Sequence, residues 1–258
     1  KVSSKQLTAL EKEIGTNVID LFPNYGLELQ GRKPMMQGTP LPQGRKPMMQ
    51  EGWRYDSASY SSELILWIGG GDMGSLPPVD PLKTVWIMDT GIDPTHQDLQ
   101  GIVVSDLRFS GFPNSSYKED DNGHGTLVAG VIGAKAFNQS QGYPDDIGVN
   151  GVYPKARMVS VKVLDGEGDS NLKIMLNGLN FIEKYAKPGD VVNISLGTKN
   201  KGKDCSWGQL GRKIQDIAAK KIFIVFSAGN ETDLNSTNFP SCLADGNFMI
   251  SVGSIDMY

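Results

Sequence analysis

No stretch of this chain is long and apolar enough to cross a membrane, because its longest hydrophobic runs have the length of a single strand. The net charge of −4 also gives no reason to expect a nucleic acid as a partner. Hydrophobic residues make up 39% of the 258 positions. That content predicts one full core, with room for a small appended segment.

Two short motifs that would indicate other classes of protein are missing or incomplete. No Gly-x-Gly-x-x-Gly follows an early strand, and the cluster Gly69-Gly-Gly71 lacks that spacing, which argues against a dinucleotide-binding domain. Asp-Thr-Gly occurs once, at Asp89. An aspartic protease needs two such carboxylates and a β-rich fold, so this class is also disfavoured.

Two short stretches carry the chemistry that is present. An apolar run from Thr84 ends in Asp89 and is followed at once by Gly91, which is typical of a buried strand that brings a carboxylate to a sheet edge. Only two histidines occur, and His124 lies between two glycines just before a run of small apolar residues that suits a tightly packed helix. These two segments therefore predict a carboxylate at the end of a strand and an imidazole at the start of a helix. A nucleophilic hydrolase needs these two groups as orienter and base.

Three segments together resemble the subtilisin-like serine proteases, the subtilases. They are Asp89-Thr-Gly-Ile-Asp-Pro-Thr-His-Gln-Asp-Leu99, then Asn122-Gly-His-Gly-Thr126 with Val128-Ala-Gly130, and Ser227-Ala-Gly-Asn-Glu231. The resemblance extends over roughly residues 84–258. It implies a three-layer α/β fold with a mainly parallel sheet between helices, of which the C-terminal part is absent from this chain.

The periodicity of residues 84–258 agrees with that fold. Apolar stretches predict strands at 84–89, 102–109, 156–164, 190–196, 222–228 and 248–254. Amphipathic stretches predict helices at 125–135, 170–186 and 207–221. Continuous apolar strands that alternate with helices favour a parallel sheet covered on both faces, with the site at the carboxyl ends of the strands.

The resemblance also implies a role for each catalytic residue. His124 is expected to act as general base and Asp89 to hold the imidazole in its working tautomer, while the Asn230 amide would stabilise the oxyanion. His96, outside the glycine frame, is expected to be structural.

Further residues are expected to bind an extended polypeptide substrate. By resemblance, Ser195-Leu196-Gly197 pairs with the substrate backbone as a strand, and Ser227-Ala228-Gly229 borders the same cleft. Glu231 either lines the pocket before the scissile bond, where it would favour a basic side chain, or is a solvated surface residue.

The nucleophile of the family has no counterpart here, because no Gly-Thr-Ser occurs in the sequence. One reading is a serine endopeptidase whose serine lies in a missing continuation or a companion chain. The alternative is a catalytically inactive, subtilase-like domain that binds peptides. The first is favoured because Asp89, His124 and Asn230 are all present.

A structural calcium ion is implied by resemblance as well. Asp98 and a loop containing Asp145, Ile147 and Val149 correspond to the family's oxygen ligands. An aspartate at position 145 replaces the usual asparagine and adds negative charge. An ordinary acidic turn is the alternative.

Residues 1–52 are expected to form an N-terminal extension, and residues 53–258 the N-terminal part of a catalytic domain. Positions 4–14 predict a helix, and 17–22 with 26–29 predict a strand pair, similar to the end of an inhibitory propeptide. Gln30-Gly-Arg-Lys-Pro-Met-Met-Gln37 is repeated at 43–50, which favours an exposed linker open to proteolytic processing, although a recent duplication explains it equally well.

The chain starts at Lys1 without a methionine or signal peptide, which suggests a processed product. Its two cysteines, Cys205 and Cys242, are either separate thiols or, by resemblance, a disulfide between loops that border the cleft. A disulfide would point to an oxidising, secreted or extracytoplasmic location.

Overall fold

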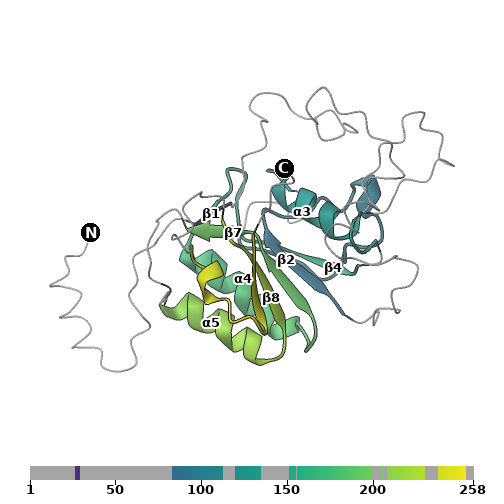
Figure 1. Ribbon diagram of the computed structural model, residues 1–258. Coiled ribbons are helices and arrows are strands. Elements are labelled where there is room, and N and C mark those ends of the chain that lie inside the picture. Colours follow the sequence, from purple (N-terminus) through teal and green to yellow (C-terminus); the bar gives the residue numbers. More distant parts are fainter. Residues whose placement is uncertain are drawn as a thin grey trace, which may run out of the picture.

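The computed structural model describes residues 27–29, 83–112, 120–134, 151–154, 156–198, 205, 208–229 and 238–253. Six parallel strands form the main sheet, in the order β3-β4-β2-β6-β8-β9 (Figure 1). These strands are β2 (Val85–Asp89), β3 (Phe109–Ser110), β4 (Met158–Lys162), β6 (Val191–Ile194), β8 (Phe223–Ser227) and β9 (Met249–Val252). The helices are α3 (His124–Gly133), α4 (Leu172–Tyr185) and α5 (Gly208–Ala219), with 3-10 turns η2 (Gln97–Leu99) and η4 (Ser241–Leu243).

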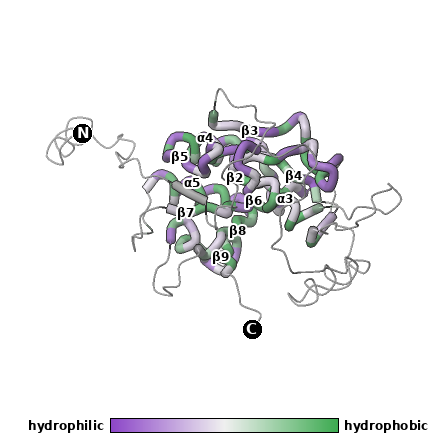
Figure 2. Tube along the Cα trace, turned by 90° about the horizontal axis from the view of Figure 1, so that it is seen from above, coloured by the Kyte–Doolittle hydropathy of each residue, from purple (hydrophilic) through white to green (hydrophobic). Residues whose placement is uncertain are grey.

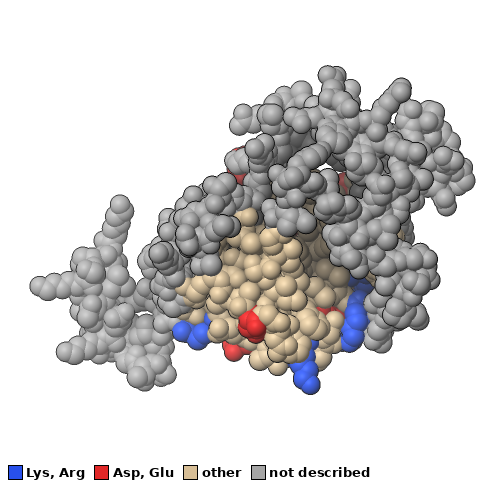
Figure 3. Space-filling model, in the orientation of Figure 1, with Lys and Arg blue, Asp and Glu red and all other residues tan. Residues whose placement is uncertain are grey.

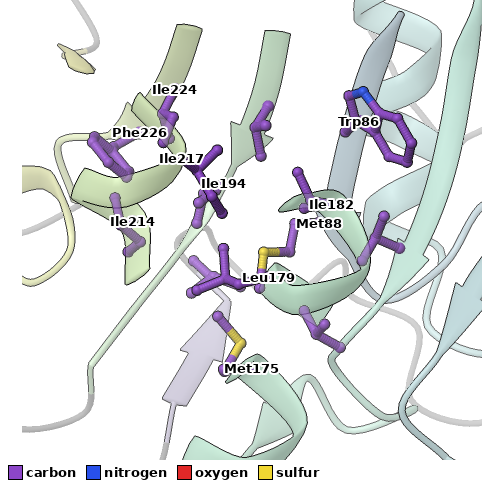
Figure 4. Close-up of a cluster of buried hydrophobic side chains, with 14 of the residues drawn as sticks. Trp86, Met88, Met175, Leu179, Ile182, Ile194, Ile214, Ile217, Ile224 and Phe226 are labelled. Atoms are coloured by element: carbon purple, nitrogen blue, oxygen red, sulfur yellow. The ribbon is translucent and has the colours of Figure 1, made fainter. Parts of the chain in front are cut away.

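Helices cover both faces of this sheet. Trp86 and Met88 on β2 pack into the cluster that contains the buried residues of α4 and α5, as Figure 4 shows for its central members. Ile87, between them, faces the opposite way and packs with Ala129 of α3. Because side chains alternate along a strand, this division places α4 and α5 on one face and α3 on the other. The predicted three-layer α/β fold with a parallel sheet is therefore confirmed.

A second, smaller sheet has the order β5-β1-β7 and is antiparallel. Its strands are β1 (Leu27–Leu29), β5 (Asp169–Ser170) and β7 (Leu196–Thr198). β7 begins two residues after β6 ends, so the small sheet lies next to the carboxyl edge of the main sheet. The strand predicted at 26–29 is present, but its partners are β5 and β7, and the predicted partner 17–22 lies outside the described residues.

Most predicted elements occur within about two residues of their expected ends. The exception is the strand at 102–109, of which only Phe109–Ser110 is a strand, while Val103 makes a single bridge to Met158. The backbone bends at residues 105–107, which begin with Ser-Asp. These two residues favour turns because their side chains hydrogen-bond nearby backbone groups. The helix expected at 4–14 and the domain boundary at 52–53 lie outside the described residues, so both stay predictions.

Cys205 and Cys242 form a disulfide, with their Cα atoms 6.0 Å apart. It joins the segment before α5 to η4. In the part of the chain that the structure describes, no helix has the length and hydrophobicity needed to cross a bilayer. Hydrophobic residues occur along β8 in Figure 2, and the described residues visible in Figure 3 carry scattered acidic and basic side chains.

Candidate active site

Three of the predicted site segments meet at the carboxyl edge of the main sheet. Met88 pairs with Ile194 and Ile194 with Phe226, so these residues lie level in β2, β6 and β8. The next residues along the strands are Asp89, Ser195 and Ser227. Loops that follow parallel strands meet at the same edge, and the structure brings these three predicted site residues there.

Asp89 and His124 are in direct contact. The Oδ1 atom of Asp89 lies 2.8 Å from Nδ1 of His124, and the same oxygen accepts a hydrogen bond of 2.7 Å from the backbone N–H of Thr90. When Asp89 is ionised, Nδ1 of the imidazole donates, which leaves Nε2 as the basic nitrogen. That tautomer is the one a general base needs to take a proton from a nucleophile.

The carboxylate is held in an unfavourable environment. Asp89 is fully buried, and its Oδ2 atom has no hydrogen-bond partner. Burial raises the pKa of Asp89 above its ordinary value, and the hydrogen bond with His124 offsets part of that rise. His124 keeps 12% of its side chain exposed, so a substrate-side group can reach it. Perturbed pKa values of this kind are frequent at functional sites.

Glycines let the two segments approach. A Cβ atom added at Gly125 would lie 2.0 Å from the carbonyl oxygen of Gly91, so no other residue fits there. Gly91 and Gly123 have φ values of 118° and 96°, a region that only glycine adopts readily. The glycines on each side of His124 therefore bring the start of α3 against the end of β2.

Asp120 organises the loop before His124, and sequence analysis did not identify it. Its carboxylate accepts hydrogen bonds from the backbone N–H groups of Asn122, Gly123 and Thr126, at 3.2, 2.8 and 2.8 Å. It also accepts from the hydroxyl groups of Thr126 and Thr90, both at 2.7 Å. A carboxylate at a helix start suits the exposed N–H groups there. The only available signal was an acidic residue four positions before the histidine.

The predicted substrate strand is a strand in the structure. Leu196 and Gly197 belong to β7 and pair with Leu29 and Glu28 of β1, respectively. Ser195 lies in the junction between β6 and β7, where the Asn193 amide donates to its hydroxyl group at 2.9 Å. β1 therefore occupies the hydrogen-bonding edge that was expected to bind a peptide.

The other cleft residues lie at the end of β8. Ser227 is the last residue of the strand and its buried hydroxyl group has no hydrogen-bond partner. Ala228 donates to the Val252 carbonyl at 2.8 Å, and Gly229 turns the chain with a φ of 108°. Asn230 and Glu231 lie outside the described residues.

Of the four predicted calcium ligands, the structure describes one. Asp98 lies in η2, and its buried Oδ1 atom has no hydrogen-bond partner, which fits a cation ligand. Burial raises the pKa of this carboxyl group. Asp145, Ile147 and Val149 lie outside the described residues. Within the described stretches, no cluster of three or more histidine, cysteine or acidic side chains could hold a metal.

Comparison with known proteins finds several serine proteases. The chain is similar to the minor extracellular protease Epr of Bacillus subtilis, with 35% identity over 60% of this chain and 21% of that protein. It is also similar to the major intracellular serine protease of Bacillus subtilis, with 33% identity over 67% and 51% of the two chains, and to subtilisin DY of Bacillus licheniformis, with 33% identity over 67% and 56%. This chain thus spans between a fifth and little more than half of these relatives.

The fold is also found in a solved structure. A cold-adapted subtilisin-like serine proteinase matches with a TM-score of 0.54 and 24% identity, over 72% of this chain and 59% of that one. Residues 83–258 match the Peptidase_S8 family, described as the subtilase family. This match covers well over half of the chain and contains Asp89 and His124, so the protein belongs to the subtilase family.

Proposed function

We propose that this chain forms part of a serine endopeptidase that cleaves peptide bonds with an Asp-His-Ser triad. The Asp89–His124 contact of 2.8 Å at the carboxyl edge of the sheet carries the proposal. His124 takes the proton of the attacking serine and returns it to the leaving amine, while Asp89 stabilises the imidazolium. Asn230 donates to the oxyanion of the tetrahedral intermediate.

The substrate is a polypeptide that binds as an added strand. The antiparallel pairing of β7 with a three-residue strand supports this mode, because any backbone can make the same hydrogen bonds. Ser195, Leu196 and Gly197 form one edge of the groove, and Ser227, Ala228 and Gly229 border it from β8. Glu231 lines the pocket for the residue before the scissile bond and favours a basic side chain.

The serine belongs to a polypeptide segment outside these 258 residues, either a continuation or a companion chain. Two observations support this proposal. The relatives are longer than the matched region, and β9, the last strand of the main sheet, exposes Ile250 by 39% and Val252 by 53%. On α3, Leu127 and Val131 are each 54% exposed. Apolar surface of this extent suits a further packed layer.

Labelling with a fluorophosphonate, which reacts with an activated serine, tests the triad. The protein is isolated together with any polypeptide that copurifies, labelled, and analysed by denaturing mass spectrometry. A label on a companion chain, or on a species heavier than 28.0 kDa, is the expected result, and His124→Ala abolishes it. An unlabelled sample that still binds peptides would instead establish the inactive, peptide-binding alternative.

The N-terminal extension acts as an inhibitory segment of the propeptide type. The position of β1 supports this, since Glu28 pairs with Gly197 on one side and with Asp169 on the other. Glu28→Pro removes an N–H group from that ladder and should increase the initial rate of peptide hydrolysis by the complete enzyme. Glu28→Ala keeps the N–H group and is the matched control. Equal rates for the two variants and the native protein would refute inhibition by β1.

A calcium ion at Asp98, Asp145 and the carbonyl groups of Ile147 and Val149 stabilises the fold. The unpartnered oxygen of Asp98 supports the site. Calcium should raise the melting temperature of the native protein and leave Asp98→Ala unchanged, as measured by calorimetry with and without a chelator. An equal response of both proteins would contradict a site at Asp98.

The protein is secreted, and its linker is cut during maturation. The Cys205–Cys242 disulfide supports an oxidising compartment, and one relative is described as extracellular while another is intracellular. The repeated Arg-Lys pairs at 32–33 and 45–46 are the proposed processing positions. N-terminal sequencing of the mature protein from culture medium tests both proposals.

A further inference from the structure

Lys162 is buried where a lysine is unexpected. It is the last residue of β4 and pairs with Asp89 across the parallel β2–β4 ladder. Its side chain has essentially no exposed surface. An ammonium group that leaves water costs several kcal/mol unless it is paired and hydrogen-bonded. The contacts that compensate this cost therefore indicate what the side chain does.

The ammonium group contacts both segments that carry the dyad. Nζ of Lys162 donates to the carbonyl oxygen of Thr90 at 2.5 Å, and Thr90 directly follows Asp89. It also pairs with Oδ1 of Asp121 at 2.5 Å, three residues before His124. The ring of Phe112 lies 5.6 Å from Nζ, measured to the ring centroid. One cation thus bridges the end of β2 and the loop that leads into α3.

Thr90 is held on its other side as well. Its hydroxyl group donates to Asp120 at 2.7 Å and accepts from the backbone N–H of Gly125 at 2.9 Å. Several hydrogen bonds therefore connect the loop before α3 to the end of β2 in addition to the Asp89–His124 hydrogen bond. Among the contacts described here, only those of Lys162 come from a third element, β4.

We propose that Lys162 is a positioning residue that bridges Thr90 and Asp121 and thereby holds His124 against Asp89. This inference rests on the proposed roles of Asp89 and His124. Lys162 acts through the two segments that it joins. It also supplies a positive charge in a region where Asp89, Asp120 and Asp121 are acidic.

Nuclear magnetic resonance of the 258-residue chain tests the proposal without any need for hydrolysis. The chain has only two histidines, so the imidazole signals of His124 and His96 can be followed separately. The informative signal is the low-field proton of the hydrogen-bonded Nδ1–H of His124. The described charged groups that bear on this loop are Asp89 on β2, Asp120 and Asp121 before α3, and Lys162 on β4.

Lys162→Met should weaken or abolish the low-field proton of His124, because the loop that carries His124 is then no longer held at the end of β2. Asp121→Asn removes the carboxylate that pairs with Lys162 and should weaken the same signal. Lys220→Met, at a surface lysine that pairs with Glu183, is the matched control and should leave this signal unchanged.

Folded Lys162→Met with unchanged His124 signals would overturn the proposal. If that variant does not fold, Asp121→Asn decides instead, because Asp121 is half-exposed. An unchanged low-field proton in Asp121→Asn would then overturn the proposal. Failure of the proposed function can be distinguished from failure of the Lys162 proposal. A complete domain without peptidase activity would contradict the triad, but the His124 signals would still behave as expected.

Discussion

Asp89 is the residue at which stability and function oppose each other. In the proposed triad its charge orients His124, yet the side chain is fully buried and one of its oxygens has no partner. A buried carboxylate with too few hydrogen bonds lowers the free energy of unfolding, and such groups persist at sites where the fold holds a functional side chain in place. The same carboxyl group therefore provides a test that depends on pH.

Asp89→Asn is expected to stabilise the fold at neutral pH. Burial raises the pKa of Asp89, so its contribution to folding is fully present below the ordinary pKa and is lost as pH rises through the raised value. Asparagine is neutral throughout. The difference in melting temperature between variant and native protein should be near zero in acid, grow with pH, and be largest where the imidazole is also neutral. Thermal denaturation between about pH 4 and 8 measures it.

Asp245→Asn provides a control of opposite sign. The pKa of Asp245 is lowered by hydrogen bonds from the backbone N–H groups of Asn247 and Met249. Its contribution is present above the ordinary pKa and is lost as pH falls, so this variant should be less stable than the native protein at neutral pH. A pH-independent difference for Asp89→Asn would contradict the first prediction.

Gly125→Ala should disrupt the dyad. The added Cβ atom would lie 2.0 Å from the Gly91 carbonyl oxygen, so the backbone must shift. The expected loss in the free energy of unfolding is about 1–3 kcal/mol, with loss of the low-field His124 proton. Gly130→Ala is the matched control on the same helix, because its Cβ atom would meet nothing within 4 Å and should stabilise α3 by up to about 1 kcal/mol. Equal denaturation midpoints for both variants would refute the steric argument.

At the scale of elements, the site depends on connections that hold the helices in place. α4 and α5 pack on one face of the sheet and α3, which begins at His124, packs on the other. The disulfide adds a covalent connection between the segment before α5 and η4, across 37 residues of sequence.

Reduction of this disulfide should lower the free energy of unfolding by about 4 kcal/mol, the chain-entropy value for a loop of this length. Urea denaturation with and without a reducing agent measures the change. The double variant Cys205→Ser, Cys242→Ser should have the stability of the reduced native protein. Addition of a reducing agent should leave the stability of this variant unchanged. A native protein with unchanged stability after complete reduction would contradict the prediction.

At the scale of the whole molecule, the main sheet ends on one side in an exposed strand. Among the described strands, β9 pairs with β8 alone, and its Ile250 and Val252 are both exposed. An apolar edge strand readily pairs with another chain. The described part of the domain therefore presents an edge where a further segment can add.

Val252→Lys should reduce self-association of the isolated chain, because a charged side chain on an edge strand opposes pairing. In the proposed complete enzyme the same change should lower the yield of folded protein. Analytical ultracentrifugation measures the first effect. Val152→Lys is the control, since this valine is 41% exposed but lies outside the sheet, and equal association of the two variants would contradict a role for β9.

The order of elements and the candidate dyad could be predicted because their signals are local. An apolar run that ends in Asp89 and a glycine-flanked His124 depend on neighbouring residues, and so do the periods that distinguish strand from helix. The prediction of a strand over the whole of 102–109 was wrong, and the reason is also local, because Ser105 and Asp106 favour a bend.

The amino-acid sequence by itself determined the class of fold, the subtilase resemblance and the pairing of Asp89 with His124. Only the tertiary structure revealed β1 between β5 and β7, the hydrogen bonds of Asp120 and the bridge made by Lys162. β1 and Lys162 join segments far apart in the chain, so their contacts depend on how whole elements pack. The bonds of Asp120 depend on the conformation that its loop adopts, which the neighbouring residue types do not specify. Asp89 and His124 are also distant in sequence, but the family resemblance supplied that pairing.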